Sequence, residues 1–163
     1  MFGKKMRNLL LILALVGLSG CETLPQPRQV SNGHVSARVP FGYFSHVDDN
    51  GWINIGVPEA TAGVSIERIS NSEEFQKRAL GDLELTRNCY PKEWVSVTEI
   101  TTLGHLKGRG YKEIISEVKN DDEAGYETYF FLVESDGWWM ISAVNQCGDK
   151  SSWRNILASL RSK

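Results

Sequence analysis

The sequence predicts an α+β domain in which one mostly antiparallel sheet is flanked by two helices. Most of the chain after its N-terminal region consists of short segments with strand character, bounded by turn residues. Residues 70–83 and 151–160 instead place apolar side chains at helical spacing. Asp136-Gly137 separates two long apolar segments, which is a strong signal of a β-hairpin. Runs of strands with few helices between them are typical of α+β domains.

The first half of the domain contains three predicted strands. Residues 35–39 alternate apolar and polar side chains and end before Pro40. The turn at residues 48–51 (Asp-Asp-Asn-Gly) leads into a second strand at residues 52–55. A third strand is expected at residues 64–69, where Val64, Ile66 and Ile69 provide the apolar positions.

The first helix is predicted from the change of period after residue 69. The segment Ser70-Asn71-Ser72-Glu73 resembles a capping box. Apolar residues then recur at helical spacing, at Phe75, Ala79, Leu80 and Leu83. Gly81 weakens this helix without excluding it.

The second half of the domain contains four more predicted strands and the second helix. Strands are expected at residues 95–103 and 111–118, with a glycine-rich loop between them, and at residues 126–134 and 138–144. The last two are apolar on both faces, so we expect them at the centre of a covered sheet. Trp153, Ile156, Leu157 and Leu160 form a helical stripe, capped by Ser151 or Ser152. The predicted order is β-β-β-α-β-β-β-β-α.

The end of the chain resembles a known family. The aromatic hairpin followed by Trp153-x-x-Ile156-Leu157-x-Ser159-Leu160 looks like the end of PsbP-like domains, and the resemblance covers residues 52–161. It implies an antiparallel sheet between helices, and a role in binding or assembly rather than catalysis. It identifies no functional residue in this chain.

The N-terminal 20 residues have the features of a signal peptide. Lys4, Lys5 and Arg7 precede the uncharged segment Leu9–Leu18, whose ten residues reach about 15 Å as a helix, half of a bilayer core of about 30 Å. Leu18-Ser19-Gly20-Cys21 resembles the lipobox of bacterial lipoproteins. That resemblance implies cleavage before Cys21 and acyl chains on this residue, which hold the protein on a membrane. The alternatives are an ordinary secretory signal, with Cys21 as a free or disulfide-bonded thiol, and an uncleaved anchor.

The residue after the cysteine indicates which of the two membranes carries the lipoprotein. Lipoproteins kept at the inner membrane of Gram-negative bacteria carry Asp there, whereas this chain has Glu22. The resemblance therefore implies an outer-membrane lipoprotein whose domain faces the periplasm. We expect residues 1–20 to be the signal peptide, residues 21–33 a lipidated tether and residues 34–163 the globular domain.

The charge of the mature chain disfavours some classes of partner. After removal of residues 1–20, 15 basic and 20 acidic side chains remain, a net charge of −5. Nucleic acids and anionic membrane surfaces attract basic proteins, so the acidic balance argues against both as partners. The membrane contact is instead expected through the acyl chains on Cys21.

Two cysteines remain for the mature domain. Cys89 and Cys147 form an isolated pair in a chain expected in an oxidising compartment, so we predict a disulfide between them. A redox or catalytic role is disfavoured, because the two are too far apart for a Cys-x-x-Cys motif and neither has a nearby His.

No motif for catalysis or for a cofactor is present, and we expect neither a catalytic residue nor a cofactor. The sequence lacks a Gly-x-Ser-x-Gly elbow, a His-Glu-x-x-His pair and a set of four Cys/His ligands. His34, His46 and His105 are far apart and near turns, so no metal site is expected. The acidic segments 48–50 and 121–123 lack the EF-hand spacing and are interpreted as solvated turns.

The glycine-rich segment 104–110 is the most unusual loop. His105, Lys107 and Arg109 alternate with its glycines, and backbone N–H groups with nearby cations can bind an anion or a partner. The alternative is an ordinary hairpin loop. Among the five tryptophans, Trp52 and Trp94 remain candidates for an exposed binding patch.

These observations favour a lipid-anchored, non-enzymatic module that binds another cell-envelope protein, as an assembly factor or as an immunity or inhibitor protein. One alternative is an envelope enzyme acting on the cell wall, in which carboxylates such as Glu113 and Glu127 converge in a cleft. Another is a purely structural lipoprotein, which would have a flat polar surface without an apolar patch.

Overall fold

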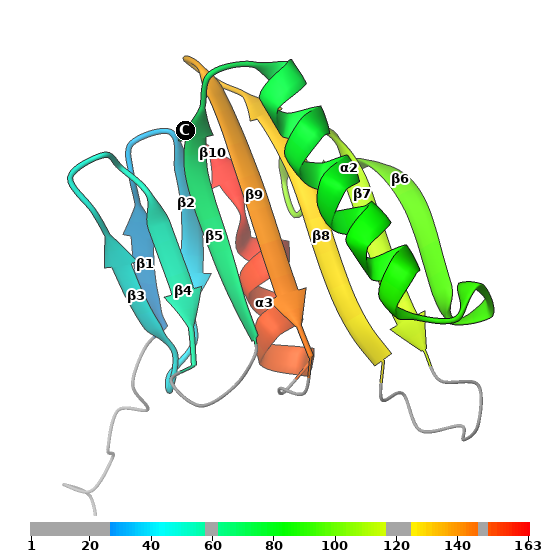
Figure 1. Ribbon diagram of the computed structural model, residues 1–163. Helices are drawn as coiled ribbons and strands as arrows, with labels where there is room; N and C mark the ends of the chain where they lie inside the picture. Colours follow the sequence, from blue (N-terminus) through cyan, green and yellow to red (C-terminus); the bar gives the residue numbers. More distant parts are fainter. Residues whose placement is uncertain (1–26, 58–61, 117–124, 147–149) are drawn as a thin grey trace, which may run out of the picture.

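The computed structural model describes residues 27–57, 62–116, 125–146 and 150–163. At its centre lies a seven-stranded antiparallel sheet with the order β3-β4-β5-β9-β8-β7-β6 (Figure 1). The strands are β3 (Phe44–Val47), β4 (Ile53–Gly56), β5 (Ala62–Ile69), β6 (Val95–Leu103), β7 (Leu106–Ser116), β8 (Gly125–Glu134) and β9 (Trp138–Asn145). β8 and β9 are interior strands of this sheet, as their two apolar faces predicted.

Helix α2 (Ser72–Cys89) covers part of one face of this main sheet. Its buried residues pack on side chains of β5, β8 and β9 in one cluster, made of Ile69, Phe75, Ala79, Leu83, Phe130, Leu132 and Met140. We call this side of the sheet the α2 face.

The predicted capping box forms one residue further along the chain. Asn71 is the N-cap, and its side-chain oxygen accepts a hydrogen bond from the backbone N–H of Glu74. The carboxylate of Glu74 in turn accepts one from the backbone N–H of Ser70. The helix then continues to Cys89, past the apolar stripe that predicted it.

The opposite side of the main sheet, the α3 face, is covered by helix α3 (Lys150–Ser159) and a second sheet. This second sheet has three antiparallel strands in the order β1-β2-β10, namely β1 (Arg28–Ser31), β2 (Val35–Val39) and β10 (Arg161–Ser162). The predicted apolar stripe of the helix is buried in the same core as β2 and the main sheet, with Trp153, Ile156 and Leu160 fully enclosed. Since α3 begins at Lys150, Ser151 and Ser152 lie in its first turn and not at its N-cap.

The predicted α+β class is confirmed, and the structure adds a second, three-stranded sheet that the sequence did not predict. Strand β1 lies inside residues 21–33, and it pairs with β2 over its whole length. β1 contributes one buried side chain, Val30, so its sequence shows no alternation. Strand β3 has no buried residue, and β10 is two residues long. Such strands leave no pattern to recognise.

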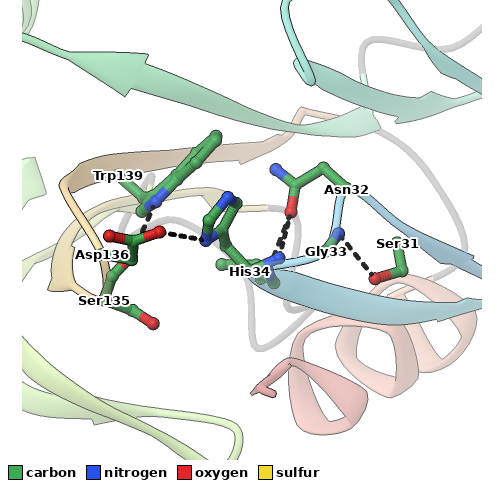
Figure 2. Close-up of polar contacts among 8 residues, drawn as sticks. Ser31, Asn32, Gly33, His34, Ser135, Asp136 and Trp139 are labelled. Carbon is green, nitrogen blue, oxygen red and sulfur yellow. Dashed lines mark hydrogen bonds and ion pairs between the residues drawn. The ribbon is translucent and has the colours of Figure 1, made fainter.

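The turn between β1 and β2 fastens the small sheet to the predicted hairpin of β8 and β9 (Figure 2). The side-chain oxygen of Asn32 accepts a hydrogen bond from the backbone N–H of His34. The His34 ring stacks on Trp139 with 4.9 Å between ring centroids, and its Nδ1 lies 3.9 Å from Oδ2 of Asp136 in the hairpin turn. Trp139 donates a hydrogen bond from Nε1 to the carbonyl oxygen of Ser135.

Within the described part of the chain, no helix is long and apolar enough to cross a membrane.

Candidate functional site

The first candidate site is an open depression of about 490 Å³ on the α2 face, which we call the apolar hollow. It is lined by residues of five strands and by Val57, which follows β4: Phe44, Asn54, Ile55, Gly56, Val57, Ala62, Gly63, Val64, Ser65, Thr128, Phe130, Ser142, Ala143 and Val144. Phe44 is 47% exposed although it is a large apolar residue. The volume lies within the range of about 300–1,000 Å³ that is usual for ligand pockets.

The hollow exists because α2 covers only one end of the interior strands. In β9, Trp138 and Met140 pack under the helix, whereas Ser142 and Val144 on the same face line the hollow. Figure 1 shows α2 over β8 and β7, away from β4. The sheet therefore presents an apolar face that no described helix covers.

Two paired glycines keep the floor of the hollow low. Gly56 and Gly63 lie opposite each other on β4 and β5. A Cβ atom on Gly56 would lie 3.1 Å from the Phe44 ring, and one on Gly63 would lie 3.0 Å from the carbonyl oxygen of Ile55. Because glycine has no side chain, these two positions leave room beside Phe44 that a side chain would fill.

The second candidate site is a depression of similar volume on the opposite side of the molecule, the cationic hollow. It is lined by Pro27, Arg38, Pro40, His105, Asn155, Ala158, Ser159 and Arg161. Antiparallel pairing of β2 with β10 brings Arg38 and Arg161 to one place, although they are far apart in the sequence. Sequence reasoning missed both arginines, because the two-residue β10 gives no signal from which this pairing is predicted.

The predicted glycine-rich loop is mostly a strand. Only Gly104-His105 form the turn, and β7 begins at Leu106. Lys107 and Arg109 are exposed, and strand alternation places them on the α2 face with Tyr111, away from His105 in the cationic hollow. The three residues therefore do not share one loop, and of the three only His105 lines a candidate site.

The close packing of β7 on β8 explains the glycines of this segment. A Cβ atom on Gly108 would lie 2.0 Å from the carbonyl oxygen of Leu132, and one on Gly110 would lie 2.1 Å from that of Phe130. Glycine is therefore required here by the close approach of β7 to β8, and not by a bound anion.

The two carboxylates of the enzyme alternative do not converge. Glu113 on β7 lies opposite Thr128, and Glu127 on β8 lies opposite Ile114. Because neighbouring residues of a strand point to opposite faces, Glu113 faces α2 and Glu127 faces α3. They share no cleft, so the structure does not place them as an acid and base pair.

Glu113 is almost fully buried under α2 without complete hydrogen bonding. Its Oε1 has no hydrogen-bond partner among the described residues. Burial raises the pKa of this carboxyl above its ordinary value, and the hydroxyl of Thr86 and the charge of Arg87 lower it only in part. The negative form of Glu113 is therefore disfavoured in the folded protein.

Glu127 is equally buried but well paired. It accepts hydrogen bonds from Tyr129 at 2.7 Å and Arg154 at 3.1 Å, and Lys112 lies at 2.8 Å. Burial acts to raise the pKa of Glu127, but the hydrogen bonds from Lys112, Tyr129 and Arg154 outweigh it, and the net pKa is below the ordinary value. This cluster braces α3 against β7 and β8.

The remaining candidates lie apart from the two hollows. His34 is in the β1–β2 turn and His46 is on β3, so neither meets His105, and no group of three potential metal ligands occurs among the described residues. Asp48 accepts hydrogen bonds from the backbone N–H groups of Asn50 and Trp52, which makes it a turn residue. Residues 121–123 lie outside the described part.

The cysteines and tryptophans complete the candidate residues. Cys89 is exposed at the end of α2 and is the one cysteine among the described residues. Cys21 and Cys147 lie outside the described residues, so the disulfide and the lipidation stay predictions. Trp52 is 39% exposed and lines a shallow, polar depression with Arg68 and Glu74, and Trp94 is half-buried in the 3₁₀ turn Lys92–Trp94.

Comparisons with known proteins identify no family. The sequence matches no protein-family model and no curated protein. A protein of solved structure from Bacteroides thetaiotaomicron VPI-5482 is similar to this chain with a TM-score of 0.43 and 16% sequence identity, over 85% of this chain and 49% of that one. This chain thus spans about half the length of that protein.

Proposed function

We propose that the mature protein is a lipid-anchored binding module of the cell envelope. Acyl chains on Cys21 hold it at the outer membrane, and the domain faces the periplasm. The apolar hollow binds another envelope protein, in an assembly or an inhibitory role.

The observation that carries the binding role is the uncovered apolar face of the main sheet. Exposed apolar patches mark interaction sites on many proteins, and this one includes the large, 47% exposed side chain of Phe44. Phe44 stands at the edge of the hollow beside a floor of Gly56, Gly63, Ser65 and Ser142. This combination of a raised aromatic ring and a low floor fits apolar side chains that project from a partner.

The same observation favours this role over the alternatives. A structural lipoprotein without a ligand has no need for an exposed apolar depression. An enzyme with two carboxylates is disfavoured, since Glu113 and Glu127 lie on opposite faces of the sheet. The acidic mature chain, with its net charge of −5, favours a partner of opposite charge around the contact.

The anchor rests on the lipobox Leu18-Ser19-Gly20-Cys21. In the native host, metabolic labelling with palmitate should mark the wild-type protein and leave a Cys21→Ala variant unlabelled and soluble in the periplasm. A labelled or membrane-bound variant would contradict the anchor.

The binding role is tested by affinity capture from detergent extracts of the native envelope, with the mature protein as bait. Ser142→Arg places a long charged side chain in the apolar hollow, whereas Leu85→Arg makes the same change at a 69% exposed residue on α2. We expect a partner in near-equal amount with wild type and Leu85→Arg, and at least a tenfold loss with Ser142→Arg. Equal capture by both variants would contradict a site in this hollow.

A further inference from the structure

We propose that the cationic hollow binds the phosphate of a lipid headgroup in the membrane that carries the anchor. The phosphate chemistry follows from the residues of the hollow, and the lipid as its source rests on the proposed anchor at Cys21.

The charges of the hollow are not paired with other charges in the described part of the chain. No described carboxylate lines it, and neither Arg38 nor Arg161 forms an ion pair in the described part of the chain. This is unusual in a mature chain with 20 acidic and 15 basic residues. Guanidinium groups stay charged and match the oxygens of a phosphate in a two-pronged geometry. His105 and the amide of Asn155 add further hydrogen-bond donors.

The backbone around these side chains is held by hydrogen bonds. The N–H of Arg38 donates to Oγ of Ser159 at 2.8 Å, and the N–H of His105 donates to the carbonyl oxygen of Leu160 at 2.8 Å. Gly104 has a φ of +60°, and a Cβ atom there would lie 2.3 Å from the carbonyl oxygen of Leu157. The turn that carries His105 is thus seated against the end of α3, to which the backbone of Arg38 is also hydrogen-bonded.

Three carbonyl oxygens at the end of α3 already accept hydrogen bonds. A helix C-terminus normally exposes carbonyl oxygens with partial negative charge. Here the carbonyl of Ile156 accepts from Oγ of Ser159, that of Leu157 accepts from the N–H of Leu160, and that of Leu160 accepts from the N–H of His105. These hydrogen bonds reduce the negative charge that the three carbonyls present to the hollow, which favours the guanidinium groups as its main charges.

The position of the hollow points to the membrane as the source of the phosphate. Pro27, the first described residue, is part of its lining. Cys21 is six residues earlier in the sequence, and six residues span at most about 20 Å when fully extended. A lipidated Cys21 therefore keeps the hollow within about 20 Å of the headgroups. The whole molecule is acidic, but this part of its surface is suited to an anionic surface.

Binding is measured with the mature chain that carries Cys21→Ser and no acyl chain. All described core residues lie between Val30 and Leu160, so this chain keeps the complete core. The probes are inorganic phosphate and dihexanoyl phosphatidylglycerol below its micelle concentration. The readout is the NMR shift of the backbone N–H of His105, with calorimetry for the affinity.

We expect saturable binding that the double variant Arg38→Gln/Arg161→Gln weakens at least tenfold. The control, Arg109→Gln, removes a single positive charge from an exposed position on β7 and should change the affinity less than twofold. Both arginines of the double variant are exposed, so we expect it to fold, and His105→Gln with at least a threefold loss provides an independent check.

Tenfold tighter binding of the lipid than of inorganic phosphate would identify the headgroup as the source. Equal binding of the two probes would identify a soluble phosphate and reject the lipid. Absence of saturable binding, or an equal loss in Arg109→Gln, would overturn the site itself. Partner capture through the apolar hollow uses neither Arg38 nor Arg161, so it can succeed when this inference fails, and the titration can succeed when capture fails.

Discussion

At the scale of single residues, two buried glutamates on adjacent strands have opposite pKa shifts. Glu113 lies under α2 with an oxygen that has no hydrogen-bond partner, and burial raises its pKa. Glu127 lies under α3, where burial is outweighed by three hydrogen-bonding partners that lower its pKa. The contrast comes from the partners of each carboxylate, because both side chains are almost fully buried.

We predict that Glu113→Gln stabilises the protein at neutral and alkaline pH by about 1 kcal/mol, which is the scale of an unsatisfied buried polar group. A carboxyl whose pKa is raised on folding stabilises the fold below its unfolded pKa of about 4.3 and loses that contribution as the pH rises through the folded pKa. The gain should therefore appear in denaturant unfolding at pH 8 and vanish below pH about 4. An equal gain at both pH values would contradict this account.

We predict the opposite pH dependence for Glu127→Gln. A carboxyl whose pKa is lowered on folding stabilises the fold above its unfolded pKa, and this contribution is lost as the pH falls through the folded pKa. The loss at pH 7 should be about 2 kcal/mol, below the range for a fully buried pair, because the side chains of Lys112 and Arg154 are 30% and 54% exposed. Unfolding curves should converge for the two proteins at low pH. A loss that persists unchanged in acid would reject the ionic role of Glu127.

The sequence predicted some candidate site residues and not others. His105 was recognisable because it lies among glycines next to cationic residues. Arg38 and Arg161 were not, because their proximity depends on the pairing of β2 with β10. Likewise, strand alternation does not show by itself that Glu113 and Glu127 face opposite sides of the sheet. The register between β7 and β8 is also needed.

At the scale of elements, the long and strongly patterned segments were predictable. α2 and α3 carry apolar residues at helical spacing, β8 and β9 are long apolar segments on either side of Asp136-Gly137, and the structure confirms all four. The short strands β1, β3 and β10 are exposed or nearly so, and they form because neighbouring segments offer backbone partners. Segment 106–110 was misassigned as a loop because its glycines serve the close approach of β7 to β8.

Glycine substitutions distinguish a glycine that the backbone requires from one that it does not require. Gly81 lies on the open side of α2 with no atom near a new Cβ, so Gly81→Ala should stabilise the protein by about 1 kcal/mol through its helix propensity. Gly110→Ala should destabilise it strongly, since the new Cβ would lie 2.1 Å from the carbonyl oxygen of Phe130. Thermal unfolding of both variants is the measurement. A tolerated Gly110→Ala would show that β7 can move away from β8.

At the scale of the whole molecule, the two hollows lie on opposite faces of the main sheet. The cationic hollow includes Pro27, next to the predicted tether, whereas the apolar hollow opens on the α2 face. An anchored molecule with the cationic hollow towards its membrane would present the apolar hollow to the periplasm. The two proposed sites are thus compatible with simultaneous contact to a lipid surface and to a protein partner.

Site-specific photo-crosslinking in living cells of the native host tests the central claim most directly. A photoreactive residue replaces Ser142 in the apolar hollow or, as a control, the exposed Leu85 on α2. We expect a discrete crosslinked band from position 142 that is absent from position 85, and mass spectrometry of that band should return one envelope protein. No band from position 142, or the same band from both positions, would contradict binding through this hollow.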